Sequence, residues 1–181
     1  MVLANTETKP TSSVSTWKAD KRWSDRFLPN IKRLLGEYLI TEPPAEEDAE
    51  RNTDLIVLNM SGVRVGCRIR RNSYLERYGD EFTIRSGRPS GVKTELTKVI
   101  EGWGDYFFYG FSNQDENDLS AWFIGDLKVF RLWFNRRLVE LSGKIPGNGK
   151  SNGDGSSDFI TFKIDELPQE FVIARKRGNN G

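Results

Sequence analysis

The sequence contains no histidine and only one cysteine, Cys67. Within one chain, these two absences exclude a disulfide framework, a zinc cluster, a Ser-His-Asp triad and a Cys-His dyad. Any catalysis by this chain would therefore depend on carboxylates, lysines, tyrosines or a hard metal ion. Because no histidine is available to activate Cys67, we interpret it as a small core residue and not as a nucleophile.

Long hydrophobic runs are also missing. No stretch reaches the roughly 18 apolar residues of a membrane span, and the first residues have neither the basic nor the apolar region of a secretory signal. With 181 residues, of which 36% are hydrophobic and 12% aromatic, the chain is long enough for one domain with a hydrophobic core. We therefore expect a single-domain cytoplasmic protein.

Charge is distributed unevenly along the chain, although the formal net charge is only +1. Residues 42–54 carry six acidic groups against one arginine, whereas residues 63–98 carry nine basic groups against four acidic ones. A binding partner responds to the local charge and not to the total. The basic stretch therefore predicts an anionic partner.

Composition divides the chain into three parts. Residues 1–16 are rich in Thr and Ser and predict a disordered N-terminal tail. Residues 17–175 are expected to form a single α/β domain, and residues 176–181 a basic C-terminal tail. Inside the domain, residues 143–157 are rich in Gly, Ser and Asn and predict a flexible loop.

Hydrophobic periodicity predicts three helices and six strands within that domain. The expected helices are residues 29–40, a helix capped by Ser90 with an apolar stripe of Leu96, Val99, Ile100 and Trp103, and a helix capped by Asp126. The expected strands are residues 54–59, 63–71, 81–86, 105–111, 121–124 and 159–164. Residues 60–62 are short enough for a hairpin between the first two strands. This order indicates an α/β or α+β fold with a mixed central sheet flanked by helices.

Arginines recur at even spacing in residues 63–71. Successive side chains of a strand point to opposite faces, so one face should carry a set of arginines and the other a set of smaller or apolar residues. The first set is Arg64, Arg68 and Arg70, and the second is Val65, Cys67 and Ile69. This pattern is typical of a surface that faces phosphate groups. An equally simple interpretation is that the arginines form the solvated face of an outer strand.

Residues 85–98 combine two glycines with three basic side chains just before an expected helix. The basic residues are Arg85, Arg88 and Lys93. A helix N-terminus with free backbone N–H groups suits a phosphate, but the spacing of a nucleotide-binding P-loop is missing. The segment is therefore interpreted as a nucleotide site, a contact to a nucleic-acid backbone, or a plain connection between strand and helix. The five tryptophans are core anchors or stacking platforms for bases.

The order of elements, with Asp54 opening one strand and a polar-faced strand after it, resembles the core of the PD-(D/E)XK nuclease superfamily. The resemblance covers roughly residues 25–135 and implies a restriction-endonuclease-like core. In that superfamily an Asp that opens one strand and an acidic-x-Lys motif on the next hold a divalent metal ion, Mg²⁺ or Mn²⁺, which activates water. A Glu on the first helix often assists.

Mapped onto this chain, the resemblance places the metal ligands at Asp54 and Glu37 and the acidic-x-Lys motif at Arg68-Ile69-Arg70. Arginine repels a metal ion and accepts protons poorly, so both motif positions depart from the pattern. Two alternatives follow. Either another carboxylate completes the site, with Glu50, Glu81 and Glu95 as candidates, or the scaffold binds without cutting. Without the resemblance, Asp54 is interpreted as a turn or capping residue, and Glu37 is interpreted as a surface residue.

The resemblance and the basic stretch together suggest a nuclease-like protein that binds nucleic acid, DNA in preference to RNA, and no membrane. If it is a metal-dependent hydrolase, the expected catalytic residues are Asp54, Glu37, Arg68 and Arg70. The residues expected to contact nucleic acid are Arg64, Arg68, Arg70, Arg71, Arg85, Arg88 and Lys93. The alternative is a non-catalytic module that binds a protein partner through its arginine strand and its acidic 42–54 segment. A homodimer is compatible with both hypotheses.

Overall fold

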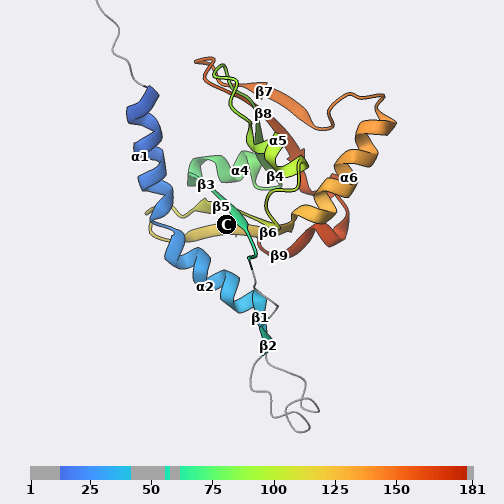
Figure 1. Cartoon of the computed structure of the whole chain (residues 1–181). Helices are drawn as coiled ribbons and strands as arrows, with labels where there is room; N and C mark the ends of the chain where they lie inside the picture. Colours follow the sequence, from blue (N-terminus) through green and yellow to red (C-terminus); the bar gives the residue numbers. More distant parts are fainter. Residues whose placement is uncertain (1–12, 42–55, 58–61, 179–181) are drawn as a thin grey trace, which may run out of the picture.

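The computed structural model (Figure 1) describes residues 13–41, 56–57 and 62–178. Asp54, Glu50 and the rest of the acidic 42–54 segment lie outside these residues. The chain begins with two helices, α1 (Ser13–Asp25) and α2 (Leu28–Leu39). Helix α1 starts before residue 17, so part of the segment predicted as a tail is helical. Helix α2 agrees closely with the helix predicted from residue 29 to residue 40.

A four-stranded mixed sheet lies at the centre of the fold, in the order β3-β5-β6-β9. Its strands are β3 (Val65–Arg70), β5 (Tyr106–Ser112), β6 (Leu119–Asp126) and β9 (Val172–Lys176). Strands β3 and β5 are parallel, and the other neighbours are antiparallel. Together with the helices, this mixture of pairings makes the fold α+β, as the sequence predicted.

The predicted hairpin between residues 54–59 and 63–71 is wrong. Strand β2 (Ile56–Val57) pairs with β1 (Ile40–Thr41), whereas β3 pairs only with β5 in the described sheet. Parallel strands need a long crossover connection, and here it contains a 3-10 turn η1 (Asn72–Tyr74), helix α4 (Leu75–Tyr78), strand β4 and helix α5. Local sequence spacing shows no sign of this long-range pairing.

A second, antiparallel sheet of three strands has the order β4-β8-β7. Its strands are β4 (Glu81–Gly87), β8 (Asp158–Lys163) and β7 (Asn148–Ser151). Strand β7 lies inside the 143–157 segment that was predicted to be a loop, and it pairs with β8 from Asn148 to Ser151. Its side chains are all exposed, so the strand has no hydrophobic signal from which it could be predicted.

The main core lies between the two sheets. Phe82 of β4 stands at its centre, with its ring stacked on the rings of Phe162 and Phe171 at centroid distances of 5.4 Å each. Two helices close this core: α5 (Glu95–Ile100) and α6 (Leu127–Glu140). Aromatic side chains supply much of its buried area, and each fully buried one contributes about 1.5–3 kcal/mol of hydrophobic free energy.

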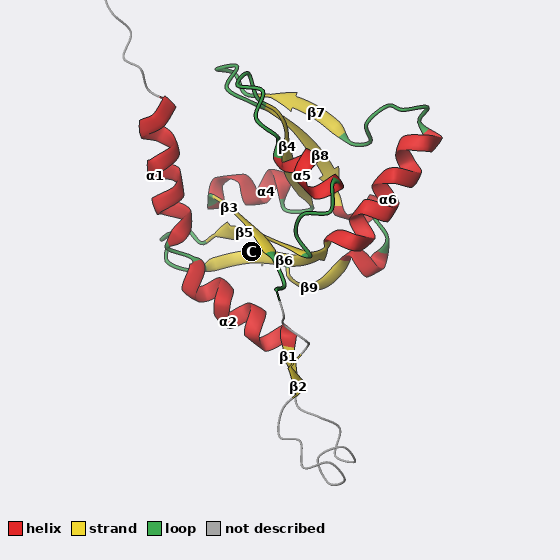
Figure 2. Ribbon diagram, in the orientation of Figure 1, coloured by secondary structure: helices red, strands yellow, loops and turns green. Residues whose placement is uncertain are grey.

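A smaller core fills the opposite face of the four-stranded sheet, against α2. Phe27, Ile31 and Leu34 pack there against Ile69 and Ile124. Figure 2 shows α2 on one side of this sheet and the three-stranded sheet with α5 and α6 on the other, while α1 stands beside the sheet and extends toward the side of the three-stranded sheet. The four-stranded sheet is therefore covered on both faces.

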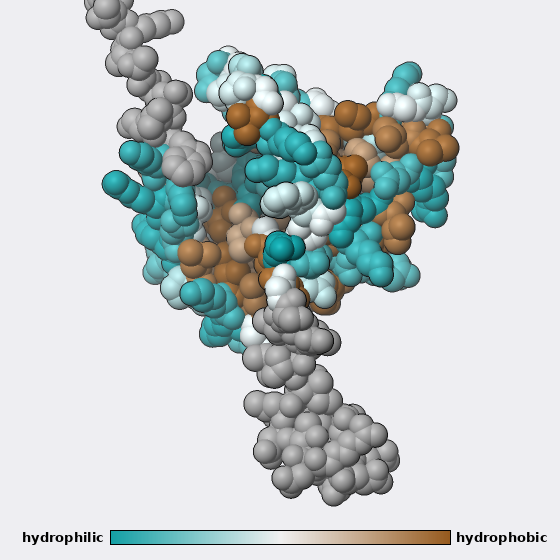
Figure 3. Space-filling view, in the orientation of Figure 1, coloured by the Kyte–Doolittle hydropathy of each residue, from teal (hydrophilic) through white to brown (hydrophobic). Residues whose placement is uncertain are grey.

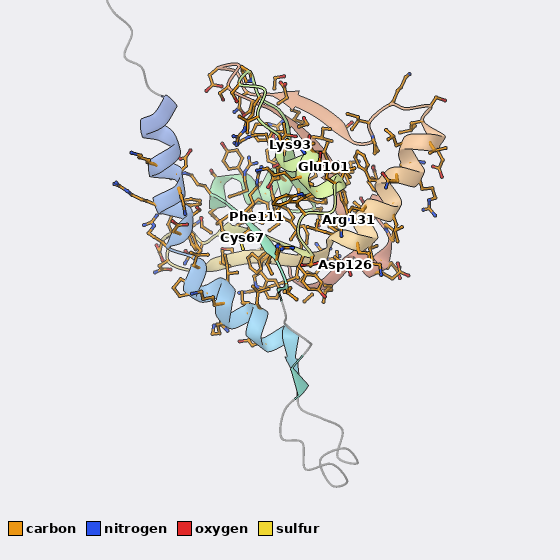
Figure 4. The ribbon with its side chains drawn as sticks, in the orientation of Figure 1. Cys67, Lys93, Glu101, Phe111, Asp126 and Arg131 are labelled. Carbon is orange, nitrogen blue, oxygen red and sulfur yellow. The ribbon has the colours of Figure 1, made fainter. Side chains whose placement is uncertain are left out.

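The two capped helices show where local signals succeeded and where they failed. Asp126 caps α6 as predicted, because its side chain accepts hydrogen bonds from the N–H groups of Lys128 and Val129 (Figure 4). Helix α5, however, is capped by Thr94 and not by Ser90. It ends at Ile100, two residues before Gly102, where φ is +96°, and Trp103 is 65% exposed instead of joining the buried stripe.

None of the helices in the described ranges is both long enough and apolar enough to cross a membrane.

Candidate nucleic-acid interface

An open cleft of about 780 Å³ separates helix α1 and strand β3 from the three-stranded sheet. Its walls come from six parts of the chain: α1, β3, the η1–α4 turn, β4, β5 and the β7–β8 pair. Figure 3 shows the surface hollowed between α1 and the three-stranded sheet, with hydrophilic residues on both sides. Elements that are distant in sequence therefore meet at one concave surface.

The arginines of β3 face this cleft. Arg68 and Arg70 both donate hydrogen bonds to the hydroxyl oxygen of Thr83, at 3.4 and 3.1 Å, while Ile69 between them packs into the smaller core. The prediction that Arg68 and Arg70 share one face is thus confirmed. This face is not an outer, fully solvated one, because β4 lies opposite and the side chain of Arg68 is only 18% exposed.

Glu95 is the carboxylate at the centre of this arginine group. Its Oε2 accepts hydrogen bonds from the Arg68 guanidinium and from the backbone N–H of Arg85. Burial lowers the pKa of Arg85, and the like charges of Arg88 and Arg68 lower it further, while Glu95 acts in the opposite direction. Two neighbouring cations thus oppose the charge of Arg85, which shows that positive charge is concentrated here.

Aromatic rings alternate with cations around the cleft. The guanidinium carbon of Arg70 lies 4.5 Å from the centre of the Tyr74 ring, and Nζ of Lys150 lies 5.0 Å from that of Tyr78. On β8, the ring of Phe159 is approached by two arginines, Arg68 at 5.8 Å and Arg85 at 5.5 Å. Cation–π attraction therefore orders several of the cationic side chains without neutralising their charge.

The floor of the cleft contains polar atoms without a partner. Within the described residues, three buried side-chain atoms have no hydrogen-bond partner: Glu81 Oε2, Arg85 Nε and Thr161 Oγ1. All three belong to residues that line this cleft. Buried polar groups are satisfied almost everywhere in folded proteins, and a cluster of exceptions is more typical of a functional site than of a structural one.

The balance of charge in the cleft is positive. Six cationic side chains line it against three carboxylates, and one of those carboxylates, Asp25, pairs with Lys21 on the exposed face of α1. Arg68, Arg70 and Arg85 meet at the floor, and Lys150 reaches in from β7. Because these cations line a concave surface, their field adds up within the cleft and favours an anionic ligand there.

The other basic residues predicted to contact nucleic acid are in different positions. Arg71 lines the cleft, but its guanidinium lies over the Trp23 ring at 4.9 Å and pairs with Glu116 at 2.9 Å. Lys93 pairs with Glu101 at 2.8 Å beside α5, away from the cleft lining (Figure 4). The structure thus separates Arg71 and Lys93 from the arginine group at the floor.

Two further basic residues lie near the group without lining the cleft. Arg64 is exposed just before β3, and its backbone N–H bonds to the carboxylate of Asp105. Arg88 is exposed in the turn after β4, and it acts on Arg85 through its charge. The segment 85–98 therefore brings only Arg85 into the cleft.

The remaining candidates are a glutamate and the cysteine. Glu37 is exposed on α2, where it pairs with Arg33, and it does not line the cleft. Cys67 is an exposed residue at the edge of the sheet, which corrects its interpretation as a core residue. Its thiol is nevertheless partly shielded from solvent, which raises its pKa to about 11. The thiol is therefore neutral near pH 7, as expected of a residue that is not a nucleophile.

Several residues of the cleft were not found from the sequence. They are Thr83, Thr161, Tyr74, Tyr78, Phe159 and Lys150. Strands were predicted at residues 81–86 and 159–164, but no local pattern showed that the strands carrying Thr83 and Phe159 are neighbours. Lys150 lies in the segment interpreted as a loop, where a single lysine carries no signal.

A divalent metal ion does not fit the described side chains of the cleft. The guanidiniums of Arg68 and Arg85 both act on Glu95, and its Oε2 already accepts two hydrogen bonds. Across the described ranges, no group of three or more acidic, histidine or cysteine side chains is arranged to hold a metal ion. Hard divalent ions need several oxygen ligands, and nearby arginines oppose their binding.

Comparisons of this chain with known protein families, with curated proteins and with solved structures give no significant match. The functional argument therefore depends on the cleft alone.

Proposed function

We propose that this protein binds nucleic acid, with DNA as the expected partner, through the cleft between β3 and the three-stranded sheet. The observation that supports this most directly is the convergence of Arg68, Arg70 and Arg85 on one cleft floor that also carries aromatic rings. Guanidinium groups bind phosphate oxygens through two parallel hydrogen bonds, and aromatic rings stack on bases.

The role of each side chain follows from its position. Within the described residues Arg70 forms no ion pair with a carboxylate, so its guanidinium can turn from Thr83 to a phosphate. Lys150 on β7 also lines the cleft and supplies a second cationic contact. Arg68 is held by Glu95 and contributes mainly through its charge.

In this proposal, the chain resembles PD-(D/E)XK nucleases in its scaffold, but it binds nucleic acid without cutting it. Arg68 and Arg70 occupy the positions of the acidic-x-Lys motif, and both support phosphate binding in place of metal binding. We propose no hydrolytic step for the described residues.

Titration of a labelled oligonucleotide in fluorescence anisotropy tests the proposal. The protein should bind, and the logarithm of its affinity should fall linearly with the logarithm of salt concentration, because phosphate contacts release counterions. Arg70→Ala should weaken binding and reduce the slope by about one. The matched control is Arg136→Ala on α6, which removes the same charge from a side chain that is 68% exposed and does not line the cleft.

Two outcomes would overturn the proposal: no binding at low salt, or equal losses in Arg70→Ala and Arg136→Ala. The second would mean that net charge, and not the cleft, attracts the oligonucleotide. Binding that is absent for nucleic acid but present for an acidic peptide would favour the alternative, a protein-interaction module.

A further inference from the structure

We infer that the ligand of this cleft is a single-stranded segment of nucleic acid and not an intact duplex. This inference rests on the proposed function and adds the strandedness of the partner. It follows from two independent observations: the depth of the cationic groups and the placement of aromatic rings at the rim.

The depth of the floor limits what can reach it. Arg68 is only 18% exposed, and two residues that line the same floor, Tyr109 and Thr161, are each 2% exposed. The phosphates of a duplex lie on the outside of a wide, stiff cylinder, which contacts an exposed surface more readily than largely buried groups on the floor of a cleft. A single strand is thin and flexible, so its backbone can follow the cleft and bring a phosphate to the arginines.

The rings at the rim are accessible to unpaired bases. Tyr74 is 41% exposed, and its ring centre lies 6.2 Å from that of Tyr78 one helical turn later. Arg70 lies against the Tyr74 ring, and two cations approach the Tyr78 ring, Lys150 at 5.0 Å and Arg77 at 5.3 Å. The cations fix the orientation of the rings and place a phosphate-binding group directly beside each one.

This arrangement matches the repeat of a single strand, in which bases and phosphates alternate along the backbone. Bases that are paired and stacked inside a duplex cannot reach a tyrosine ring, whereas unpaired bases can. Stacking accepts any base, because every base has a π face, so the interface should show little sequence preference.

The experiment compares three ligands of one sequence: a labelled single strand of about a dozen nucleotides, the duplex formed from it, and the corresponding RNA single strand. At fixed salt, the single strand should bind about tenfold or more tightly than the duplex. Tyr74→Ala should weaken the single strand about tenfold and leave the duplex nearly unchanged. Comparable binding of the RNA strand also supports the inference, which concerns strandedness and not the sugar.

Two further variants guard against misfolding and nonspecific effects. Tyr78→Ala removes the second ring independently, so that a folding defect in one variant does not decide the result. Trp103→Ala is the matched control, because this ring is 65% exposed but does not line the cleft, and it should change no affinity.

The inference and the proposed function fail in different ways. A duplex that binds as tightly as the single strand, with a loss in Arg70→Ala but none in Tyr74→Ala, would overturn the single-strand inference and leave nucleic-acid binding intact. Failure of every oligonucleotide to bind would overturn both.

Discussion

Arg68 on β3 and Glu95 at the start of α5 form an ion pair that bridges the cleft floor. Because α5 packs against β4, this pair connects the four-stranded sheet to the three-stranded one. It also places a negative charge beside a cleft whose proposed ligand is an anion. Glu95 therefore stabilises the fold and at the same time opposes binding.

Glu95→Gln should separate these two effects. We expect a loss of about 1–2 kcal/mol in the free energy of unfolding, because Arg68 loses its charged partner while Arg85 remains nearby. We also expect tighter oligonucleotide binding, since the cleft gains one unit of positive charge. Urea denaturation and anisotropy measure the two quantities. Glu101→Gln is the control, because Glu101 pairs with Lys93 outside the cleft, and equal gains in affinity for both variants would contradict the prediction.

Thr83 and Thr161 are register partners on β4 and β8, but their hydroxyl groups differ in their hydrogen bonds. The Thr83 hydroxyl bonds to Arg68, Arg70 and the hydroxyl of Tyr109, whereas that of Thr161 is buried without a partner. Thr83→Val should therefore destabilise the protein by about 1–3 kcal/mol, while Thr161→Val should be neutral or stabilising. Thermal melts test the pair, and a large loss in Thr161→Val would show that its hydroxyl is satisfied in solution.

The elements that were predicted well are those whose signal is local. Asp126 opens α6 through its own side chain, and the alternation of Arg68, Ile69 and Arg70 is a property of any strand. Strands β5 and β6 are dominated by aromatic and apolar residues, so their burial could be predicted from composition.

The site itself could be predicted only in part, because a cleft is formed by long-range pairing. The sequence identified Arg68, Arg70 and Arg85, but not that β4 and β8 would place Thr83 and Phe159 opposite them. The predicted hairpin failed for the same reason, since the pairing of β3 with β5 spans a crossover connection. Spacing within a segment does not encode which distant strand becomes its neighbour.

The segment predicted as a flexible loop contains one glycine with a structural role. Gly147 has φ of +92°, and a Cβ there would lie 2.6 Å from Ile160 Cγ2 and 2.8 Å from the carbonyl oxygen of Thr161. Gly147→Ala should cost about 1–3 kcal/mol and lower Tm by several degrees. Gly153→Ala is the control, because a Cβ at that position meets nothing within 4 Å. If both variants melted at the same temperature, the strand β7 assignment would be contradicted.

Helix α1, one wall of the cleft, should be anchored in a pH-dependent way. Glu116 accepts hydrogen bonds from Trp23 and Arg26 and pairs with Arg71. The hydrogen bond from Trp23, followed by those cations, lowers the pKa of Glu116 below its usual value of 4.5. A carboxyl group with a depressed folded-state pKa stabilises the fold above its unfolded pKa, and this stabilisation is lost as pH falls through the folded value.

Stability measured between pH 7 and pH 3 should therefore decline less steeply in Glu116→Gln than in the unaltered protein. The neutral amide cannot titrate, so it removes this contribution while keeping most of the side-chain volume. Asp154→Asn is a useful comparison, because Asp154 also has a lowered pKa but bonds only to Ser156 and does not contact α1. Identical profiles of stability against pH for Glu116→Gln and the unaltered protein would contradict the anchoring of α1 by Glu116.

The last prediction concerns cleavage. The PD-(D/E)XK resemblance expected from the sequence would place a metal ion at Asp54, which lies outside the described residues, and its acidic-x-Lys motif at Arg68 and Arg70, which face the cleft. Arg68 and Arg70 cannot supply a metal-held hydroxide. We therefore expect Mg²⁺ or Mn²⁺ to support at most weak nicking of DNA. We also expect Asp54→Asn to leave DNA binding unaffected. Incubation of plasmid and single-stranded DNA with each metal, followed by electrophoresis, measures this. Robust cleavage that disappears in Asp54→Asn while binding persists would contradict the expectation, and it would mean that carboxylates outside the arginine group complete a catalytic site.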